Sequence, residues 1–133
     1  MNILSIGSKI TLRKISEEIL DKVETINFLD TTTNNFLNWG LSKTKKINYY
    51  SGDITKIDTL INAGLNDSDI IIVHSENDME SLFIAQKSKI NVNSSIFVIL
   101  EDLSLAEIFE SLGFIIFDSH NLKITRLLNK LGN

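Results

Sequence analysis

Residues 69–100, DIIIVHSENDMESLFIAQKSKINVNSSIFVIL, decide the fold. The stretch begins with one apolar run, IIIV, and ends with another, IFVIL, and neither run alternates with polar residues. Strands without polar alternation are typical of a parallel sheet that is covered on both faces. Between the two runs, Leu82 and Phe83 belong to a segment that we interpret as a helix lying on the sheet. The stretch therefore predicts a strand, a helix and a second strand parallel to the first.

The same alternation of short apolar runs and longer segments continues along the rest of the chain. Runs bounded by Gly, Asp or Asn predict six strands: Asn2–Ile6, Thr25–Leu29, Lys46–Tyr50, Asp69–His74, Ser95–Leu100 and Phe114–Phe117. Apolar residues three and four apart predict helices with one stripe on the sheet: Leu12, Ile15, Ile19 and Val23; Ile57, Leu60 and Ile61; Leu82 and Phe83; Leu105, Ile108, Phe109 and Leu112; Ile124, Leu127, Leu128 and Leu131. The segment Thr31–Lys45, rich in Thr and Asn, is the weakest helix prediction.

Six strands that alternate with helices predict an α/β fold, with a doubly wound parallel sheet and helices on both faces. No linker, repeat or low-complexity tract interrupts the chain, so we expect one domain over residues 1–133. Thr55 and Asp58 resemble a capping box at a helix start. Gly64 and Gly113 stand where left-handed helix ends are expected.

The composition excludes several kinds of chemistry. Without Cys, the chain has no disulfide, iron–sulfur cluster or thiol catalysis, and two histidines are too few for a three-His zinc site. We therefore expect no metal. A net charge of −4 argues against a nucleic-acid partner. No run reaches the roughly 18 apolar residues of a membrane span, and no signal peptide opens the chain, so we expect a cytosolic protein without direct membrane insertion.

The turn after the first strand is the first candidate for a ligand site. In doubly wound folds, ligands bind beyond the carboxyl ends of the strands, where the strand order reverses. Here the first strand is followed by Gly7-Ser8-Lys9-Ile10. A dinucleotide-binding turn reads G-x-G-x-x-G, but Lys9 and Leu12 occupy its second and third glycine positions. Lys9 either supplies positive charge to a phosphate or is a solvated lysine at a tight turn.

Two aspartates follow the next two strands. Asp30 lies about 20 residues beyond the glycine turn, where a carboxylate accepts hydrogen bonds from a ribose. Alternatively, Asp30 forms a cap or turn with Thr31–Thr33. Asp53, in the turn Gly52-Asp53, either binds an adenine or ribose edge or only stabilises the start of the next helix.

The remaining strand ends carry more acid than base. His74 ends the fourth strand and is a candidate general base, but no nucleophile motif such as G-x-S-x-G surrounds it, so we expect no catalytic residues. His120 is expected to be a cap or a surface residue. Four carboxylates near these ends are expected mainly to begin the following helices: Glu76, Asp78, Glu101 and Asp102. So much negative charge disfavours a phosphate-rich ligand.

Two longer stretches carry a family resemblance. GDITKIDTLINAGLNDSDIIIVHSENDMESLFIAQKSK, at residues 52–89, and LAEIFESLGFIIFDS, at residues 105–119, resemble the N-terminal domain of the regulator-of-K+-conductance family, also called RCK, KTN or TrkA-N. That family shows a GDAT…L…AGI…ADAVIAVT run followed by an AEIFEKLG run. With Gly7 and Asp30 also in step, the resemblance extends over essentially the whole chain.

The resemblance implies a Rossmann-like regulatory domain that binds an adenine nucleotide or NAD(H) and controls a potassium channel or K+ uptake transporter. Gly7 matches the start of the phosphate loop, Asp30 the ribose carboxylate, and Asp53 with Ile54 the adenine-side contact. The resemblance also implies a homo-oligomer, a dimer or larger, and a membrane-embedded partner at the inner face of the membrane. The expected nucleotide-binding residues are Gly7, Ser8, Lys9, Ile10, Asp30, Thr31, Gly52, Asp53, Ile54 and His74.

The departures from the family pattern lie on the ligand side. Besides the two lost glycines, His74 stands where Thr is usual, Glu80 where Asn is frequent, and Ile99 where Arg is common. We therefore expect nucleotide binding to be weak or absent. A small NAD(P)-dependent oxidoreductase and a ligand-free oligomerisation module are the alternatives. The sequence ends after the predicted helix Asn121–Leu131, which packs either on its own sheet or against a partner subunit.

Overall fold

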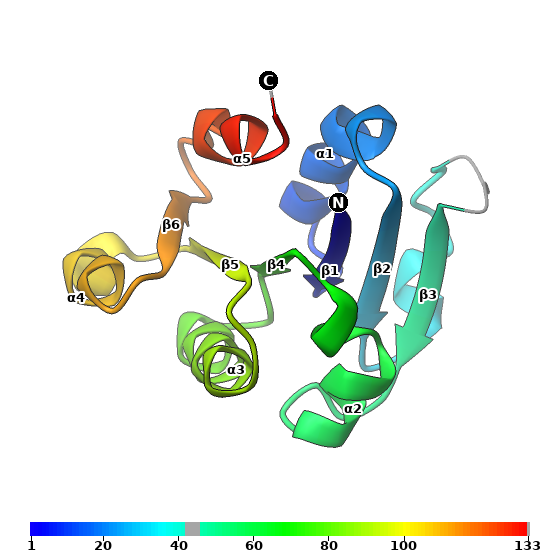
Figure 1. Cartoon of the computed structure of the whole chain (residues 1–133), viewed down its shortest axis with the longest axis horizontal. Helices are drawn as coiled ribbons and strands as arrows, with labels where there is room; N and C mark the ends of the chain where they lie inside the picture. Colours follow the sequence, from blue (N-terminus) through cyan, green and yellow to red (C-terminus); the bar gives the residue numbers. More distant parts are fainter. Residues whose placement is uncertain (42–45, 133) are drawn as a thin grey trace.

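A single parallel sheet forms the centre of the computed structural model, which describes residues 1–41 and 46–132. Its strand order is β3-β2-β1-β4-β5-β6 (Figure 1), as in a Rossmann fold. The strands are β1 (Asn2–Ile6), β2 (Thr25–Asp30), β3 (Ile47–Ser51), β4 (Ile70–Val73), β5 (Ser95–Leu100) and β6 (Ile115–Asp118). The predicted fold class is confirmed, and each predicted strand end is correct to within one residue.

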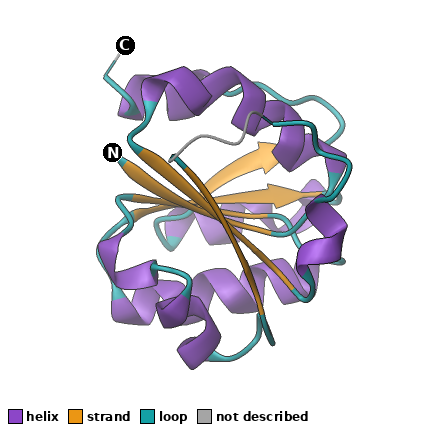
Figure 2. Cartoon of the chain, turned by 90° about the vertical axis from the view of Figure 1, so that its right-hand side faces the viewer, coloured by secondary structure: helices purple, strands orange, loops and turns teal. Residues whose placement is uncertain are grey.

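Helices cover both faces of the sheet (Figure 2). The α-helices are α1 (Ile10–Ile19), α2 (Ile57–Asn62), α3 (Asp78–Asn91), α4 (Ala106–Ser111) and α5 (Thr125–Lys130). Short 3-10 helices are η1 (Leu20–Lys22), η2 (Thr33–Phe36), η3 (Leu65–Asp67) and η4 (Leu103–Leu105). In Figure 1, α1 and α5 lie on one face, α2 and α3 lie on the other, and α4 lies beside β6.

The central strands are buried on both faces because their side chains point alternately into two cores. In β4, Ile70 and Ile72 pack in the core under α1 and α5, while Ile71 and Val73 pack in the core under α2 and α3. All four residues are buried. This explains why the run IIIV shows no polar alternation, as predicted.

The helix ends partly agree with the sequence. Gly64 and Gly113 adopt left-handed φ angles of +102° and +97° after α2 and α4, as expected. The predicted capping box is wrong, because α2 begins at Ile57 and its N-cap makes no side-chain hydrogen bond. Thr55 instead donates from its backbone N and its Oγ1 to Oδ1 of Asp53, at 3.0 and 2.6 Å.

The segment Thr31–Lys45 does not form the expected α-helix over its described residues. Only the 3-10 turn η2 forms there, and residues 42–45 lie outside the described part of the chain. Phe36 and Trp39, from this segment, pack edge to face at 4.9 Å and both contact Phe28 of β2. Aromatic packing on the sheet, rather than helix periodicity, therefore fixes the described part of this segment, residues 31–41.

The prediction that the apolar stripe of α4 faces the sheet is wrong. Leu105, Ile108 and Leu112 are 43%, 57% and 49% exposed, and only Phe109 packs partly against the core. The helix has six residues and lies beside the edge strand β6, so it covers little of the sheet. Phe83 of α3, also expected to face the sheet, is 47% exposed.

The C-terminal helix packs on its own sheet. α5 begins at Thr125, later than the predicted Asn121, and Leu127 is fully buried in the core that it shares with α1. Ile124, just before the helix, is also buried there. The first of the two interpretations of this helix therefore describes the arrangement within the chain.

Candidate functional site

The strand order reverses between β1 and β4, so the expected ligand crevice lies beyond the carboxyl ends of these two strands. Gly7 follows β1 at this point, and its backbone N donates to the carbonyl O of Leu29 at 2.8 Å. A Cβ atom at Gly7 would lie 1.9 Å from the carbonyl O of His74, and Gly7 has a φ of +115°. The glycine is therefore required by the close approach of the turn to β4, whether or not a phosphate binds.

Asp30, at the end of β2, is 7% exposed and holds the turn together. Its Oδ1 accepts a hydrogen bond from the backbone N of Thr31 at 2.7 Å. Its Oδ2 accepts from Oγ of Ser8 and from Nδ2 of Asn35, the latter at 2.9 Å. A carboxylate has about four lone-pair positions, so one remains for a ligand hydroxyl. Both sequence interpretations of Asp30, ribose acceptor and local turn, are compatible with this geometry.

The turn after β3 lies beside Asp30. Asp30 pairs with Ser51 in the sheet, and the backbone N of Gly52 donates to the carbonyl O of Asp30 at 3.2 Å. Asp53 follows on the surface. The two hydrogen bonds from Thr55 lower the pKa of the Asp53 carboxyl group. No described residue donates to its Oδ2.

Two other predicted site residues have side chains that do not form part of a polar site. Ile54 is only 4% exposed and packs in the core with Leu29 and Leu60, so a ligand contact from Ile54 would have to come from its backbone. Ile10, the first residue of α1, is 58% exposed. The structure thus brings Ser8, Asp30 and Thr31 together near Gly52, with Asp53 following in the same turn.

Lys9 follows β1 at the turn, and its ammonium group has two partners within the chain. Its Nζ lies 3.2 Å from the carbonyl O of Glu76, which follows β4, and 3.8 Å from Oε1 of Glu101, which follows β5. The side chain therefore crosses the end of β4. The Lys9 side chain is 32% exposed, so it is a partly solvated lysine whose ammonium group has two partners within the chain.

Glu101 is the centre of a cluster that we call the Glu101 cluster: Lys9, His74, Glu101, Ser119 and His120. Oε1 of Glu101 lies 2.9 Å from Nε2 of His74. Oε2 accepts from Oγ of Ser119 at 2.7 Å and lies 3.3 Å from Nε2 of His120. The cluster gathers side chains from the ends of β1, β4, β5 and β6. Glu101 was expected to begin a helix, and that expectation is wrong.

The cluster favours a charged carboxylate and a neutral imidazole. Hydrogen bonds from Ser119 and His74 lower the pKa of Glu101 to about 2. Burial lowers the pKa of His74, although the hydrogen bond to Glu101 acts in the opposite direction. Nδ1 of His74 is buried without a partner among the described residues, so protonation would leave an unpaired N–H there. We therefore assign the proton of the neutral ring to Nε2, which donates to Glu101.

Two other carboxylates at this edge accept hydrogen bonds from backbone N atoms, but only Asp102 does so at the start of its own helix, as expected. Asp78, in the first turn of α3, accepts from the backbone N atoms of Glu101 and Asp102, both at 2.9 Å. Asp102 caps η4 by accepting from the backbone N of Ser104 at 2.9 Å. Asp78 therefore fixes the backbone that carries Glu101. The helix start at α3 is capped by Asn77, not by Glu76.

Neither Ser119 nor the association of His120 with Glu101 is indicated by a motif in the sequence. The His120 side chain is 73% exposed, as expected for a surface residue. The available signal was their position directly after β6, because the ends of neighbouring parallel strands meet at one edge of a sheet. Among the described residues, no group of His, Asp and Glu is arranged to hold a metal ion.

The two sides of this edge fit an adenine nucleotide or NAD(H) unequally. At the ends of β2 and β3, Asp30 and Asp53 retain acceptor capacity for hydroxyl or amino groups. At the ends of β4 and β5, a phosphate beside Lys9 would also lie beside the carboxylate of Glu101, which repels it. The residues present therefore fit an adenosine group but not the phosphates.

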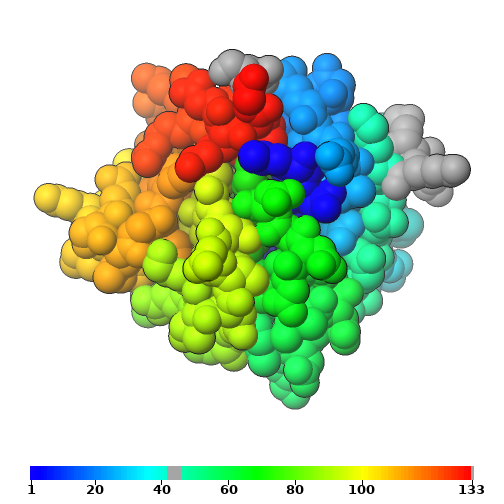
Figure 3. Space-filling model, in the orientation of Figure 1, coloured from blue at the N-terminus to red at the C-terminus, as the bar shows by residue number. Residues whose placement is uncertain are grey.

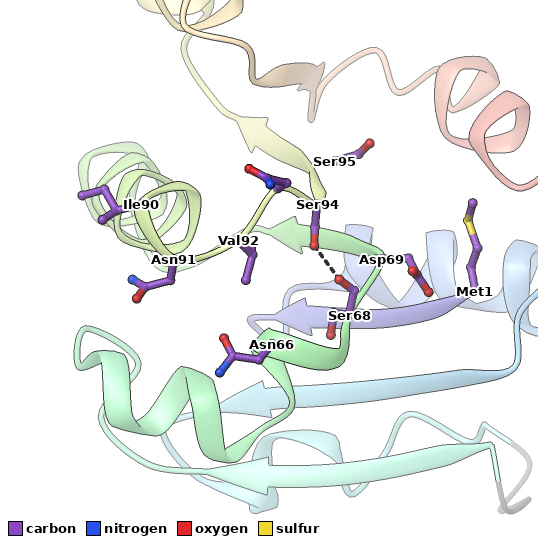
Figure 4. Close-up of a pocket in the computed structure, with 10 residues that line it drawn as sticks. Met1, Asn66, Ser68, Asp69, Ile90, Asn91, Val92, Ser94 and Ser95 are labelled. Atoms are coloured by element: carbon purple, nitrogen blue, oxygen red, sulfur yellow. Dashed lines mark hydrogen bonds between the residues drawn. The ribbon is translucent and has the colours of Figure 1, made fainter.

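A hollow of about 760 Å³ lies at the opposite, amino edge of the sheet (Figure 4). In the space-filling view of Figure 3, the blue N-terminus, the green segment before β4 and the yellow-green segment before β5 meet near the centre of this face. The hollow is lined mainly by short polar side chains, and Oγ of Ser94 already donates to the carbonyl O of Ser68 at 2.5 Å. Within the described part of the chain, no Lys, Arg or His lines the hollow. It lies at the wrong edge for a ligand site of this fold.

None of the helices in the described ranges 1–41 and 46–132 is long and apolar enough to cross a bilayer.

Three solved structures resemble this chain in fold. The GsuK channel bound to NAD has a TM-score of 0.71 at 14% identity, over 97% of this chain and 22% of the channel. The Kef C-terminal domain of Shewanella denitrificans in its AMP-bound form has 0.71 at 15%, over 100% and 83%. The NAD(P)-binding domain of an exopolyphosphatase-related protein from Archaeoglobus fulgidus has 0.71 at 14%, over 97% and 96%. At these identities the similarity shows the fold alone.

Among curated proteins, none matches this sequence. The TrkA-N domain family matches residues 13–120, which is most of the chain. This match agrees with the strand order and with the GDIT and AEIF runs on which the family resemblance depends. The chain therefore belongs to the TrkA-N domain family.

Proposed function

We propose that the chain is a regulatory domain that weakly binds the adenosine part of an adenine nucleotide or of NAD(H) at the ends of β2 and β3. The observation that carries this proposal is the juxtaposition of Asp30 and the Gly52-Asp53 turn through the hydrogen bond from Gly52 to Asp30. Both carboxylates have an acceptor position left for a ligand. Solved structures with this fold contain NAD or AMP, which supports the same ligand class.

The same proposal includes a membrane-embedded partner. TrkA-N membership and the similarity to a channel and to a Kef C-terminal domain support a role as the cytosolic regulator of a K+ channel or transporter subunit. The domain, residues 1–133, would attach to that subunit at the inner face of the membrane. The role is one of binding and regulation, without catalysis.

We also propose a homo-oligomer, a dimer or larger, formed through the outer surfaces of α3 and α4. Four large apolar side chains are exposed there: Phe83 is 47%, Ile90 85%, Ile108 57% and Leu112 49% exposed. Between the two helices, Ile90, Leu112 and Phe114 line an apolar hollow of about 450 Å³. Exposed apolar patches of this kind are typical of protein interfaces.

The ligand proposal is tested by isothermal titration calorimetry with AMP, ADP, ATP, NAD and NADH. We expect weak, saturable binding of each, because all contain adenosine. Asp53→Ala should weaken every one of them, whereas Asp21→Ala, an exposed aspartate beside Lys22, should change none. Absence of heat with all five ligands would contradict the proposal and favour a ligand-free oligomerisation module. Hydride transfer from bound NADH to an added substrate would favour an oxidoreductase.

The oligomer proposal is tested by analytical ultracentrifugation of Ile108→Glu. A charge placed in a buried interface is strongly disfavoured, so this variant should sediment as a monomer. Leu37→Glu is the matched control, because Leu37 is 76% exposed and lies away from α3 and α4 in the sequence, after η2. A wild-type monomer at every concentration, or equal effects of the two variants, would contradict the proposed interface.

A further inference from the structure

The Glu101 cluster has the composition of an anion site that already contains an anion. One carboxylate is surrounded by an ammonium group, two imidazoles and a hydroxyl: Lys9, His74, His120 and Ser119. These four groups come from three separate segments of the chain. Two of these contacts are hydrogen bonds of 2.7 and 2.9 Å, from Ser119 and His74, and the other two are ion pairs at 3.3 and 3.8 Å. Proteins bind phosphate with a similar combination of hydrogen-bond donors and positive charge.

The donors are built into the fold to different degrees. The His74 side chain is 2% exposed and directs Nε2 at Glu101, so this donor is fixed by the core. Lys9 is held close to β4 by the carbonyl O of Glu76 at 3.2 Å. The Glu101 side chain is 40% exposed, while its backbone N is bonded to Asp78. The backbone of Glu101 is thus anchored independently of its carboxylate, which is partly accessible to solvent.

We propose that Glu101 is a built-in substitute for a phosphate group, and that the Glu101 cluster becomes a phosphate-binding site when its carboxylate is removed or displaced. The ligand class is a phosphate monoester or diester, such as the phosphates of a nucleotide. The link to a nucleotide rests on the proposed function, but binding of phosphate itself does not. The low pKa of Glu101, about 2, is consistent with donors that stabilise an anion strongly.

The charges around the cluster determine how much the affinity for phosphate can increase when the charge of Glu101 is removed. With Glu101 in place, the positive charge of Lys9 is neutralised. Asp78 lies nearby but uses both carboxylate oxygens for backbone N atoms, and Oδ1 of Asp118 accepts from the backbone N of His120. Glu76 contacts Lys9 only through its carbonyl group. Removing the charge of Glu101 therefore leaves Lys9 without its carboxylate partner, in a surrounding that still contains acids.

The test is a titration of inorganic phosphate into 15N-labelled protein at constant ionic strength, followed by NMR. Glu101→Gln keeps the shape of the side chain and removes its charge. We expect it to bind phosphate about tenfold or more tightly than the wild type, with shift changes at Lys9, His74 and Ser119. Glu110→Gln removes one charge from an exposed position at the end of α4 and should behave as the wild type does.

Two further variants make the result decisive. Adding Lys9→Gln to Glu101→Gln should abolish the gain, because the ammonium group is then missing. Glu101→Asp retains the charge but moves it away from the donors by the length of one methylene group. This variant should therefore show a smaller gain in phosphate affinity, and it provides a test even if Glu101→Gln folds poorly. Equal phosphate affinity of Glu101→Gln and Glu110→Gln, or a gain that survives Lys9→Gln, would overturn the inference.

Titration with adenosine separates this inference from the proposed function. If Glu101→Gln gains phosphate binding but neither it nor the wild type binds adenosine, the inference stands and the proposed function fails. If the wild type binds adenosine and Glu101→Gln gains no phosphate binding, the proposed function stands and the inference fails.

Discussion

Both sides of the carboxyl edge of the sheet are rich in acid, but they use their carboxylates differently. At the ends of β2 and β3, Asp30 and Asp53 accept hydrogen bonds from uncharged groups and keep positions for further donors. At the ends of β4, β5 and β6, Glu101 forms an ion pair with Lys9 and accepts a hydrogen bond from His74. A carboxylate beside uncharged donors can serve a ligand, whereas one paired with a cation competes with it. Whether a carboxylate favours or opposes ligand binding therefore depends more on the side of the edge on which it lies than on the net charge of the chain.

The largest expected effect is at the junction of the two sides. Gly7→Ala places a Cβ atom 1.9 Å from the carbonyl O of His74 and also strains a φ of +115°, so we expect a loss of at least about 2 kcal/mol in the free energy of unfolding. Gly40→Ala is the control, with a φ of +66° but no contact closer than 3.8 Å, and should cost about 1 kcal/mol. Urea denaturation measures both. Equal losses would show that the approach to β4 is not what requires glycine.

On the β2–β3 side, Asp30→Ala removes the acceptor of three hydrogen bonds from a residue that is 7% exposed. We expect a loss of about 2 kcal/mol in the free energy of unfolding, together with weaker adenosine binding. Asp53→Ala should weaken adenosine binding with a much smaller loss of stability, because Asp53 is on the surface. Chemical denaturation and calorimetry of the two variants separate the roles. A stable Asp30→Ala variant would contradict the structural part of this assignment.

On the β4–β6 side, stability should depend on pH. The pKa of His74 is lowered from 6.5 and that of Glu101 from 4.5 to about 2, so both groups bind fewer protons in the folded than in the unfolded chain. Their contributions are present near neutral pH. The contribution of His74 is lost as the pH falls below 6.5, and that of Glu101 is lost between 4.5 and about 2.

Urea denaturation at a series of pH values measures this dependence. Glu101→Gln should flatten the curve in the lower range, while Glu110→Gln should leave its shape unchanged. Parallel curves for the wild type and Glu101→Gln would mean that Glu101 does not stabilise the fold through the cluster.

The smallest expected effect is that of Ser119→Ala. Its hydroxyl donates to Oε2 of Glu101 at 2.7 Å, and this bond is the largest cause of the low pKa of Glu101. The variant should raise that pKa toward its ordinary value while leaving the fold intact. An NMR titration of the labelled Glu101 carboxyl carbon measures the change. Ser104→Ala removes the corresponding hydroxyl hydrogen bond to Asp102 and should leave the pKa of Glu101 unchanged.

The fold could be predicted well because its signals are local. The runs IIIV and IFVIL contain only apolar residues, so their composition alone indicates strands that are buried on both faces. Gly64, which follows α2, is the residue type that most readily adopts the left-handed φ found there. The segment after β2 could not be predicted in this way, because Phe36 and Trp39 are fixed by contacts with Phe28 on the sheet. The exposure of the apolar stripe of α4 results from the position of the helix beside an edge strand, which the periodicity of the sequence does not indicate.

The sequence indicates strand-end residues on both sides of the candidate site, including Lys9 and His74, but not the contacts that they make with Glu101. Asp30 and the Gly52-Asp53 turn were placed by their position at strand ends, and the structure brings them together. The partners of Glu101 could not be identified, because His74 is 27 residues away in the sequence and Ser119 is 18. Strand ends indicate which residues share an edge, but not which side chains meet across it.

The comparison of the two sides is tested most directly by one ratio, the affinity of the wild-type protein for AMP divided by its affinity for adenosine, measured by calorimetry. An open β2–β3 side and a phosphate side occupied by Glu101 predict that both ligands bind and that the ratio lies within about fivefold of one. A ratio above about 100 would require strong contacts to the phosphate and would contradict the account.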